Sequence, residues 1–216
     1  MGYKVLVDSP ALYEFSDQKT RLSVFDALIL RGKVTDYTFK GSLLIQKQEG
    51  SLSESAFVDG RPVEILEVGG AYYISQTVKN IFEKHEVNAE YFDATVLIEN
   101  ELFNEDYYLF NPLDGIDCLD YDKSIYQKEF SDRGIKKTTI SAISSLVIDE
   151  EKIPEDIPLL SLGSLIIKEG GYLILDYIIL INDSLASDLS KANLRGFNMF
   201  EIENYRHDWK WRHLNK

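Results

Sequence analysis

Four aspartates stand close together in the middle of the chain, and carboxylates so close in sequence raise the question of a metal site: Asp114, Asp117, Asp120 and Asp122. Calcium is held in proteins by several oxygen ligands from one loop. The helix–loop–helix calcium site needs acids at alternate positions and a glutamate at the twelfth. Here the spacings are three, three and two, and the twelfth residue from Asp114 is Ile125. We therefore expect a turn built from aspartate side chains and no bound metal.

Other groups that could catalyse a reaction are few. None of the three histidines has a partner at the spacing of a zinc site, and His85 falls on the apolar stripe of a predicted helix, where a core histidine is expected. Cys118 has acidic neighbours, which do not lower the pKa of a thiol. The chain has no phosphate-binding glycine loop and no Gly-x-Ser-x-Gly motif. The sequence therefore predicts no catalytic residue, no cofactor and no enzyme activity.

Acidic residues dominate the charge of the 216-residue chain. Lys plus Arg is 23 and Asp plus Glu is 36, so the net charge is −13. This balance argues against a nucleic-acid partner and against docking on an anionic membrane. From His85 to Asp122 there is no lysine or arginine but there are eleven acids. Such a block is either a solvated face that keeps the protein soluble or a surface that attracts a basic partner.

One clear helix and many strands predict an α+β fold. Ser75 is a plausible N-cap, Val78, Ile81, Phe82 and His85 follow at helical spacing, and Asn88 is expected to end the helix. Residues 181–194 repeat this strand–helix–strand pattern 107 residues later, with Gly196 as the exit. Ser9-Pro10 is expected to lie in a loop and residues 59–62 to form a turn. The remaining strand signals lie at residues 3–7, 34–48, 63–68, 91–98, 107–111, 138–148, 164–168 and 172–181.

These elements predict one continuous body with a mixed or antiparallel sheet and two similar strand–helix–strand units, with no linker that separates independent domains. Residues 203–216 form a basic, aromatic tail, expected either to pack on the body or to serve as an interaction hot spot. A single cysteine rules out an internal disulfide. With no export signal and no apolar run long enough to span a membrane, we expect a cytoplasmic protein.

The middle and end of the chain resemble immunity protein family 11, a family of bacterial polymorphic toxin systems first catalogued as a domain of unknown function. The resemblance begins with a Tyr-Tyr pair in residues 107–113, continues with the acidic, aromatic segment 116–126, and includes an apolar run that ends in acids at 146–153. It closes with the strand and capped helix of 179–189 and with Gly196-Phe197. It covers roughly residues 65–202, whereas the N-terminal part of the same body, residues 1–60, matches the family poorly.

The resemblance implies a non-catalytic inhibitor that binds one cognate toxin and blocks it by occlusion. An acidic inhibitor suits a basic toxin, because complementary charge speeds encounter. Two alternatives remain: a general acidic interaction module or scaffold, and a metal-dependent enzyme that uses the four aspartates. Under the immunity hypothesis the residues expected to bind the partner are Glu99, Glu101, Glu105, Asp106, Tyr107, Asp114, Asp117, Asp120, Tyr121 and Asp122.

Overall fold

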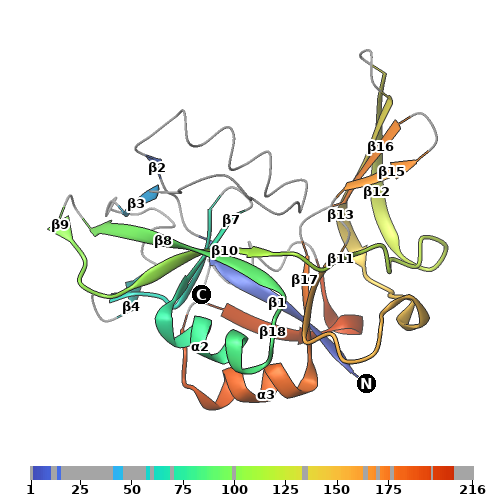
Figure 1. Cartoon of the computed structure of the whole chain (residues 1–216). Helices are drawn as coiled ribbons and strands as arrows, with labels where there is room; N and C mark the ends of the chain where they lie inside the picture. Colours follow the sequence, from blue (N-terminus) through green and yellow to red (C-terminus); the bar gives the residue numbers. More distant parts are fainter. Residues whose placement is uncertain are drawn as a thin grey trace.

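In the residues that it describes, the computed structural model (Figure 1) has a sheet of twelve strands, a sheet of four strands, a two-stranded hairpin and two α-helices. It describes residues 2–10, 14–15, 41–45, 57–58, 61–68, 71–98, 101–132, 136–162, 165–168, 171–175, 178–195 and 197–206. The predicted α+β class with mixed strand pairing is confirmed. Residues 207–216 of the basic tail, including both tryptophans, lie outside the described residues.

Twelve of the described strands form the large sheet. Two of them lie off its main path: β18 (Phe197–Glu201) pairs with β1, and β9 (Glu101–Leu102) pairs with β8. The others follow in spatial order as β11 (Gly115–Ile116), β14 (Leu159–Leu162), β17 (Ile179–Asn182), β1 (Tyr3–Pro10), β6 (Ile65–Val68), β7 (Ala71–Ser75), β10 (Tyr107–Pro112), β8 (Ala89–Ile98), β3 (Gly41–Ile45) and β2 (Glu14–Phe15).

Strand β1 holds the two halves of this sheet together. Its first part pairs antiparallel with β17, where Tyr3 faces Asn182, and with β18. Its end pairs parallel with β6, where Ser9 faces Leu66. The expectation that Ser9-Pro10 forms a loop is therefore wrong. Pro10 lies beyond the residues of β1 that face β17 and β18, so among the described residues it has a neighbouring strand on one side only, an edge position where proline is tolerated.

The large sheet buries a separate core on each face. Side chains alternate across a strand, and on β17 Leu180 belongs to one cluster while Ile179 and Ile181 belong to the other. On β14 Leu159 and Leu160 divide in the same way. Strands covered on both faces need apolar residues at nearly every position, which explains why β14 and β17 read as continuous runs rather than as alternating strands.

Both α-helices lie side by side below the sheet (Figure 1), and each begins at a polar cap that ends a buried strand. For α2 (Gln76–Lys84), the predicted cap is confirmed: Ser75 Oγ accepts from the Val78 N–H at 3.4 Å. For α3 (Asp183–Lys191), Asn182 Oδ1 accepts from the Leu185 N–H at 2.9 Å. A cap of this kind stabilises a helix by about 1 kcal/mol. The helices pack their apolar stripes on the sheet and pack against one another.

The ends of both helices differ from the expectation. Helix α2 ends at Lys84, before Asn88, and Glu86 takes the left-handed conformation with φ of 56°. The Val87 N–H donates to Phe82 O and the Glu86 N–H to Glu83 O, both at 3.0 Å, which is the Schellman pattern. Helix α3 is followed by a left-handed Asn193 (φ 51°), whereas the predicted exit residue Gly196 lies outside the described residues.

Four strands form a second sheet that projects away from the large one (Figure 1), in the order β12 (Ile125–Asp132), β13 (Lys136–Ser145), β16 (Gly171–Leu175) and β15 (Leu165–Lys168). The single strand predicted over 172–181 is wrong, because its two parts, β16 and β17, belong to different sheets and pair with different neighbours. The smaller elements are the hairpin β4 (Phe57–Val58) and β5 (Arg61–Pro62) and the 3₁₀ turns η2 (Glu150–Lys152) and η3 (Ile202–Asn204).

Two distant segments are joined by a charged clamp. Arg195 Nη2 lies 2.9 Å from Glu64 Oε1, and the Arg195 N–H donates to Glu64 Oε2 at 2.8 Å. The Glu64 N–H in turn donates to Arg195 O at 3.2 Å. These reciprocal contacts fix the segment after α3 against the start of β6.

Replacing Glu86 by glycine tests the helix exit. A side chain in the left-handed region costs about 1–2 kcal/mol, and glycine removes this strain. Glycine also gives the unfolded chain more conformational freedom, which lowers the free energy of unfolding by about 0.4–1 kcal/mol. We expect Glu86→Gly to raise the free energy of unfolding by about 0.5–1 kcal/mol, measured by urea denaturation. Glu83→Gly, inside the same helix, is the matched control and should lower it by about 1 kcal/mol. A loss of stability in Glu86→Gly would contradict this account.

Candidate functional site

The acidic block predicted from the sequence is divided in two by strand β10. Glu105 and Asp106 stand exposed before β10, beside β9, while Asp114 and the acids that follow it come after β10 (Figure 1). Six residues of strand separate the groups by about 20 Å. Glu99 lies outside the described residues, and only the backbone of Glu101 is placed, in β9. The structure therefore does not bring the predicted acids together into one patch.

The two tyrosines expected to be exposed are not. Tyr107 is 2% exposed, and its hydroxyl donates to Val63 O at 3.2 Å inside the core. This burial, in a low-dielectric setting, raises the pKa of Tyr107. Tyr121 is half-buried, and its hydroxyl donates to Asp117 Oδ1 at 2.5 Å. Tyr107 fails as a surface contact because β10 is an inner strand, between β7 and β8, and is buried at five of its six residues.

The aspartates after β10 build a turn, as the sequence indicated. Asp120 Oδ1 accepts from the N–H groups of Asp122 and Lys123 at 3.2 and 3.1 Å, and its other oxygen lies 2.7 Å from Lys123 Nζ. These bonds hold the pKa of the Asp120 carboxyl below its usual range. Asp114 Oδ1 accepts from Asn88 Nδ2 at 2.8 Å. The carboxylates of Asp114 and Asp120 therefore each have a local role in folding the segment.

A second acidic segment, distant in sequence, lies against this turn. Leu119 pairs with Ile148 in an antiparallel bridge. The Asp149 N–H donates to Cys118 O at 2.7 Å. We name the resulting surface the acidic face and define it by Asp117, Asp120, Asp122, Asp149, Glu150 and Glu151. In the sequence, residues 149–151 stand out only as part of the family pattern. The one feature that could have predicted this contact is that Leu119-Asp120 and Ile148-Asp149 are both an apolar residue followed by an acid.

Most of the charge on the acidic face is not neutralised. Within the described residues, Asp120 pairs with Lys123 and Asp149 with Lys152, the latter at 3.2 Å. The other four acids have no lysine or arginine in ion-pair contact in that part of the chain: Asp117, Asp122, Glu150 and Glu151. Tyr121, the hydrogen-bond partner of Asp117, is a hydroxyl and adds no positive charge to this face.

The electrostatics of the turn reflect this surplus of negative charge. The pKa of Lys123 is raised, first by its hydrogen bond and charge interaction with Asp120, and further by the charges of Asp149 and Asp122. The pKa of the Tyr121 hydroxyl is also raised, first by burial and then by the hydrogen bond to Asp117. Burial raises the pKa of the Cys118 thiol to about 12, so at neutral pH this side chain is a protonated core residue rather than a nucleophile.

The four aspartates proposed as a metal site do not meet around one point. Asp114, Asp117 and Asp120 each contact a different partner. In the segments that the structure describes, no group of three or more His, Cys, Asp or Glu side chains is arranged to hold a metal ion. No helix among the described residues is long and apolar enough to cross a membrane.

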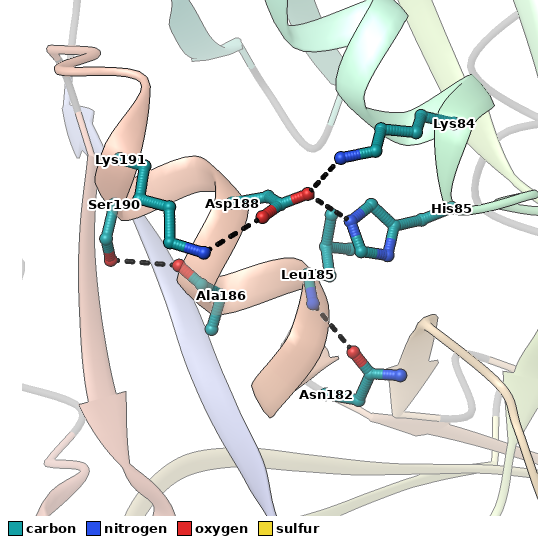
Figure 2. A network of polar contacts seen from close by, with 8 residues as sticks. All are labelled: Lys84, His85, Asn182, Leu185, Ala186, Asp188, Ser190 and Lys191. Carbon is teal, nitrogen blue, oxygen red and sulfur yellow. Dashed lines mark hydrogen bonds and ion pairs between the residues drawn. The ribbon is translucent and has the colours of Figure 1, made fainter.

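His85, the histidine on the predicted apolar stripe, takes part in a polar cluster between the two helices (Figure 2). Its Nε2 lies 3.1 Å from Asp188 Oδ2 on α3, and Lys84 Nζ lies 2.6 Å from the same oxygen. Lys191 Nζ lies 3.4 Å from the other oxygen, Oδ1. These contacts, that of Lys84 first, hold the pKa of the Asp188 carboxyl below its usual range. The cluster joins α2 to α3, and we assign it a structural role.

The immunity protein family model (Imm11) matches residues 9–156 of this sequence. This is more than half of the chain, and the chain belongs to that family. The match begins well before the region of resemblance found by inspection, 65–202, and ends before β14. It includes β10, the aspartate turn and η2 with the whole acidic face. A search of curated proteins finds no match.

Asp188 makes the stability of the helix pair dependent on pH. Because its pKa is lowered in the folded state, its contribution is present above the unfolded value of about 4 and is lost as the pH falls through the folded value. We expect Asp188→Asn to lower the free energy of unfolding at pH 7 and the difference from wild type to shrink below about pH 4. Urea denaturation at pH 7, 5 and 3.5 measures it.

Asp93→Asn is the matched control, because Asp93 is exposed on β8 and has no side-chain contact among the described residues. It should change stability little at any of the three pH values. A deficit in Asp188→Asn that stays constant from pH 7 to 3.5 would contradict the assignment.

Proposed function

We propose that this protein is an immunity protein that binds a cognate toxin directly and neutralises it by covering a surface the toxin needs. The proposed inhibitor is non-catalytic, uses no cofactor and acts on a basic toxin in the cytoplasm. The observation that carries the proposal is the family match, which spans residues 9–156 and includes the aspartate turn. The burial of Cys118 and the local contacts of the aspartates fit a binding role.

The proposed binding surface is the acidic face rather than the whole acidic block. Two segments converge there, and four of the six acids have no ion-pair partner among the described residues, which gives the surface a local excess of negative charge. The aspartate turn is also rigidly held, since Ser124 Oγ donates to Val147 O and accepts from the Val147 N–H, both at 3.0 Å. A preorganised charged surface loses little conformational entropy on binding and speeds encounter with a partner of opposite charge.

A protection assay tests the function itself. Genes that flank this one are expressed singly and together with it, and colony survival is recorded. We expect one neighbour to kill its host alone and to be tolerated with this protein, because the complex blocks the toxin. Co-purification of the two proteins in a one-to-one complex is the second expected result. Survival without any complex, or the absence of a toxic neighbour, would contradict the proposal.

Reversing charges tests the acidic face. Asp122→Lys combined with Glu151→Lys changes two exposed acids that have no ion-pair partner among the described residues. At low salt, we expect the association rate with the toxin to fall by about tenfold or more, and the effect to fade as salt screens the charges. Stopped-flow or surface-based kinetics at several salt concentrations measure it.

The matched control carries the same change of charge at the other end of β10, as Glu105→Lys with Asp106→Lys. Its association rate should stay within about threefold of wild type, because rates depend mainly on charges near the interface. Circular dichroism confirms that both variants are folded. A stronger effect in the control would show that the interface lies near β9 instead. No effect in either variant would show that the acidic block is not part of the interface.

A further inference from the structure

Within the part of the chain that the structure describes, strand β12 lies at one end of the small sheet and has an open edge. Among the described residues it pairs only with β13, from Gln127 opposite Ser141 to Asp132 opposite Lys136. An edge strand presents unpaired backbone N–H and C=O groups that can accept another strand. The register is continuous over these six residues, and the one irregularity lies earlier, between Ile125 and Gln127. The open edge is therefore regular enough to continue the ladder.

The side chains in the middle of β12 are exposed on both faces of the sheet. All four residues from Gln127 to Phe130 are exposed, although neighbours on a strand point to opposite faces. Among the described residues, three large apolar side chains are exposed, and two of them are on this strand: Ile125 at 64% and Phe130 at 65%. Exposed aromatic side chains next to a charged rim are typical of protein interfaces.

The strand lies next to the acidic face. Ser124, whose side chain is bonded to Val147, directly precedes β12, and Ser144 Oγ on β13 donates to Ile125 O at 3.3 Å. The projecting sheet thus continues from the aspartate turn (Figure 1). A partner that is held at the acidic face would have the edge of β12 within reach.

The charges on β12 disfavour a second copy of the same chain as the occupant. In a two-fold antiparallel pairing of identical strands, a residue at the centre faces its own copy. The centre of β12 falls between Lys128 and Glu129. The two registers with the greatest overlap therefore place Lys128 against Lys128 or Glu129 against Glu129, and like charges directly opposite destabilise a sheet.

We propose that the toxin adds an antiparallel strand to the edge of β12. The strand that fits has an apolar residue opposite Phe130, a basic one opposite Glu129 and an acidic one opposite Lys128, so its sequence reads apolar–basic–acidic. Backbone hydrogen bonds supply affinity in this mode, and the alternating side chains supply specificity. This inference rests on the proposed function, because it assigns a binding mode to the same toxin.

The experiment uses the full-length protein and a catalytically inactive form of the toxin found in the protection assay. Hydrogen–deuterium exchange is compared with and without toxin. The outward amides of residues 127–132 should exchange at least about tenfold more slowly in the complex. The charge-exchange variant, Lys128→Glu with Glu129→Lys, keeps the net charge and should weaken binding at least about tenfold, as should Phe130→Ala.

The matched control is a charge exchange between two other exposed residues, Glu203→Arg with Arg206→Glu, and its Kd should stay within about twofold of wild type. Thermal melting confirms that all variants are folded. If wild type binds the toxin but the β12 variants bind equally well and residues 127–132 gain no protection, strand addition is wrong and the immunity function stands. If wild type binds no toxin, both proposals fail. Wild-type self-association that Phe130→Ala abolishes would assign the edge to a second copy.

Discussion

The pairing of β1 with strands from both halves of the large sheet is the constraint on which the rest of the structure depends. β17 and β18 flank its first part, and β6 pairs with its end. Because β1 alternates its side chains, Val5 packs in one core and Leu6 in the other. A change in the register of this one strand by a single residue would exchange the two sets of side chains and disrupt both cores.

The two cores serve different parts of the proposed function. In one core, Phe82 of α2 and Leu185 of α3 pack the helices against the sheet. The other includes Cys118, Leu119, Ile140 and Ile143, which anchor the aspartate turn and the base of the projecting sheet. Polar groups around this second core are held by specific hydrogen bonds, whereas the four β12 residues from Gln127 to Phe130 are exposed. A rigid charged base beside an open strand is a suitable arrangement for a protein whose task is to bind another protein.

Local chemistry made much of the fold predictable from the sequence. The cap at Ser75, the stripe of Val78 and Phe82, and the aspartate turn follow from interactions within a few residues, so these predictions are confirmed. The division of 172–181 between two sheets was not predictable, because apolar runs look alike whichever sheet they join. The convergence of Leu119 with Ile148 depends on tertiary pairing, and Tyr107 was misjudged because aromatic residues occur both in cores and at interfaces.

The topology of β1 also determines when the protein can complete its fold during synthesis. Among the described residues, 3–8 find their antiparallel neighbours in 179–182 and 197–201, so these pairings cannot all form until about two hundred residues have left the ribosome. At typical rates of translation this takes about 10–40 s. Pairings of such long sequence separation also form slowly, because the entropy of closing the loop is lost before the contacts are gained. A cell that relies on this protein for protection would therefore need a standing stock of folded chains before the toxin is made.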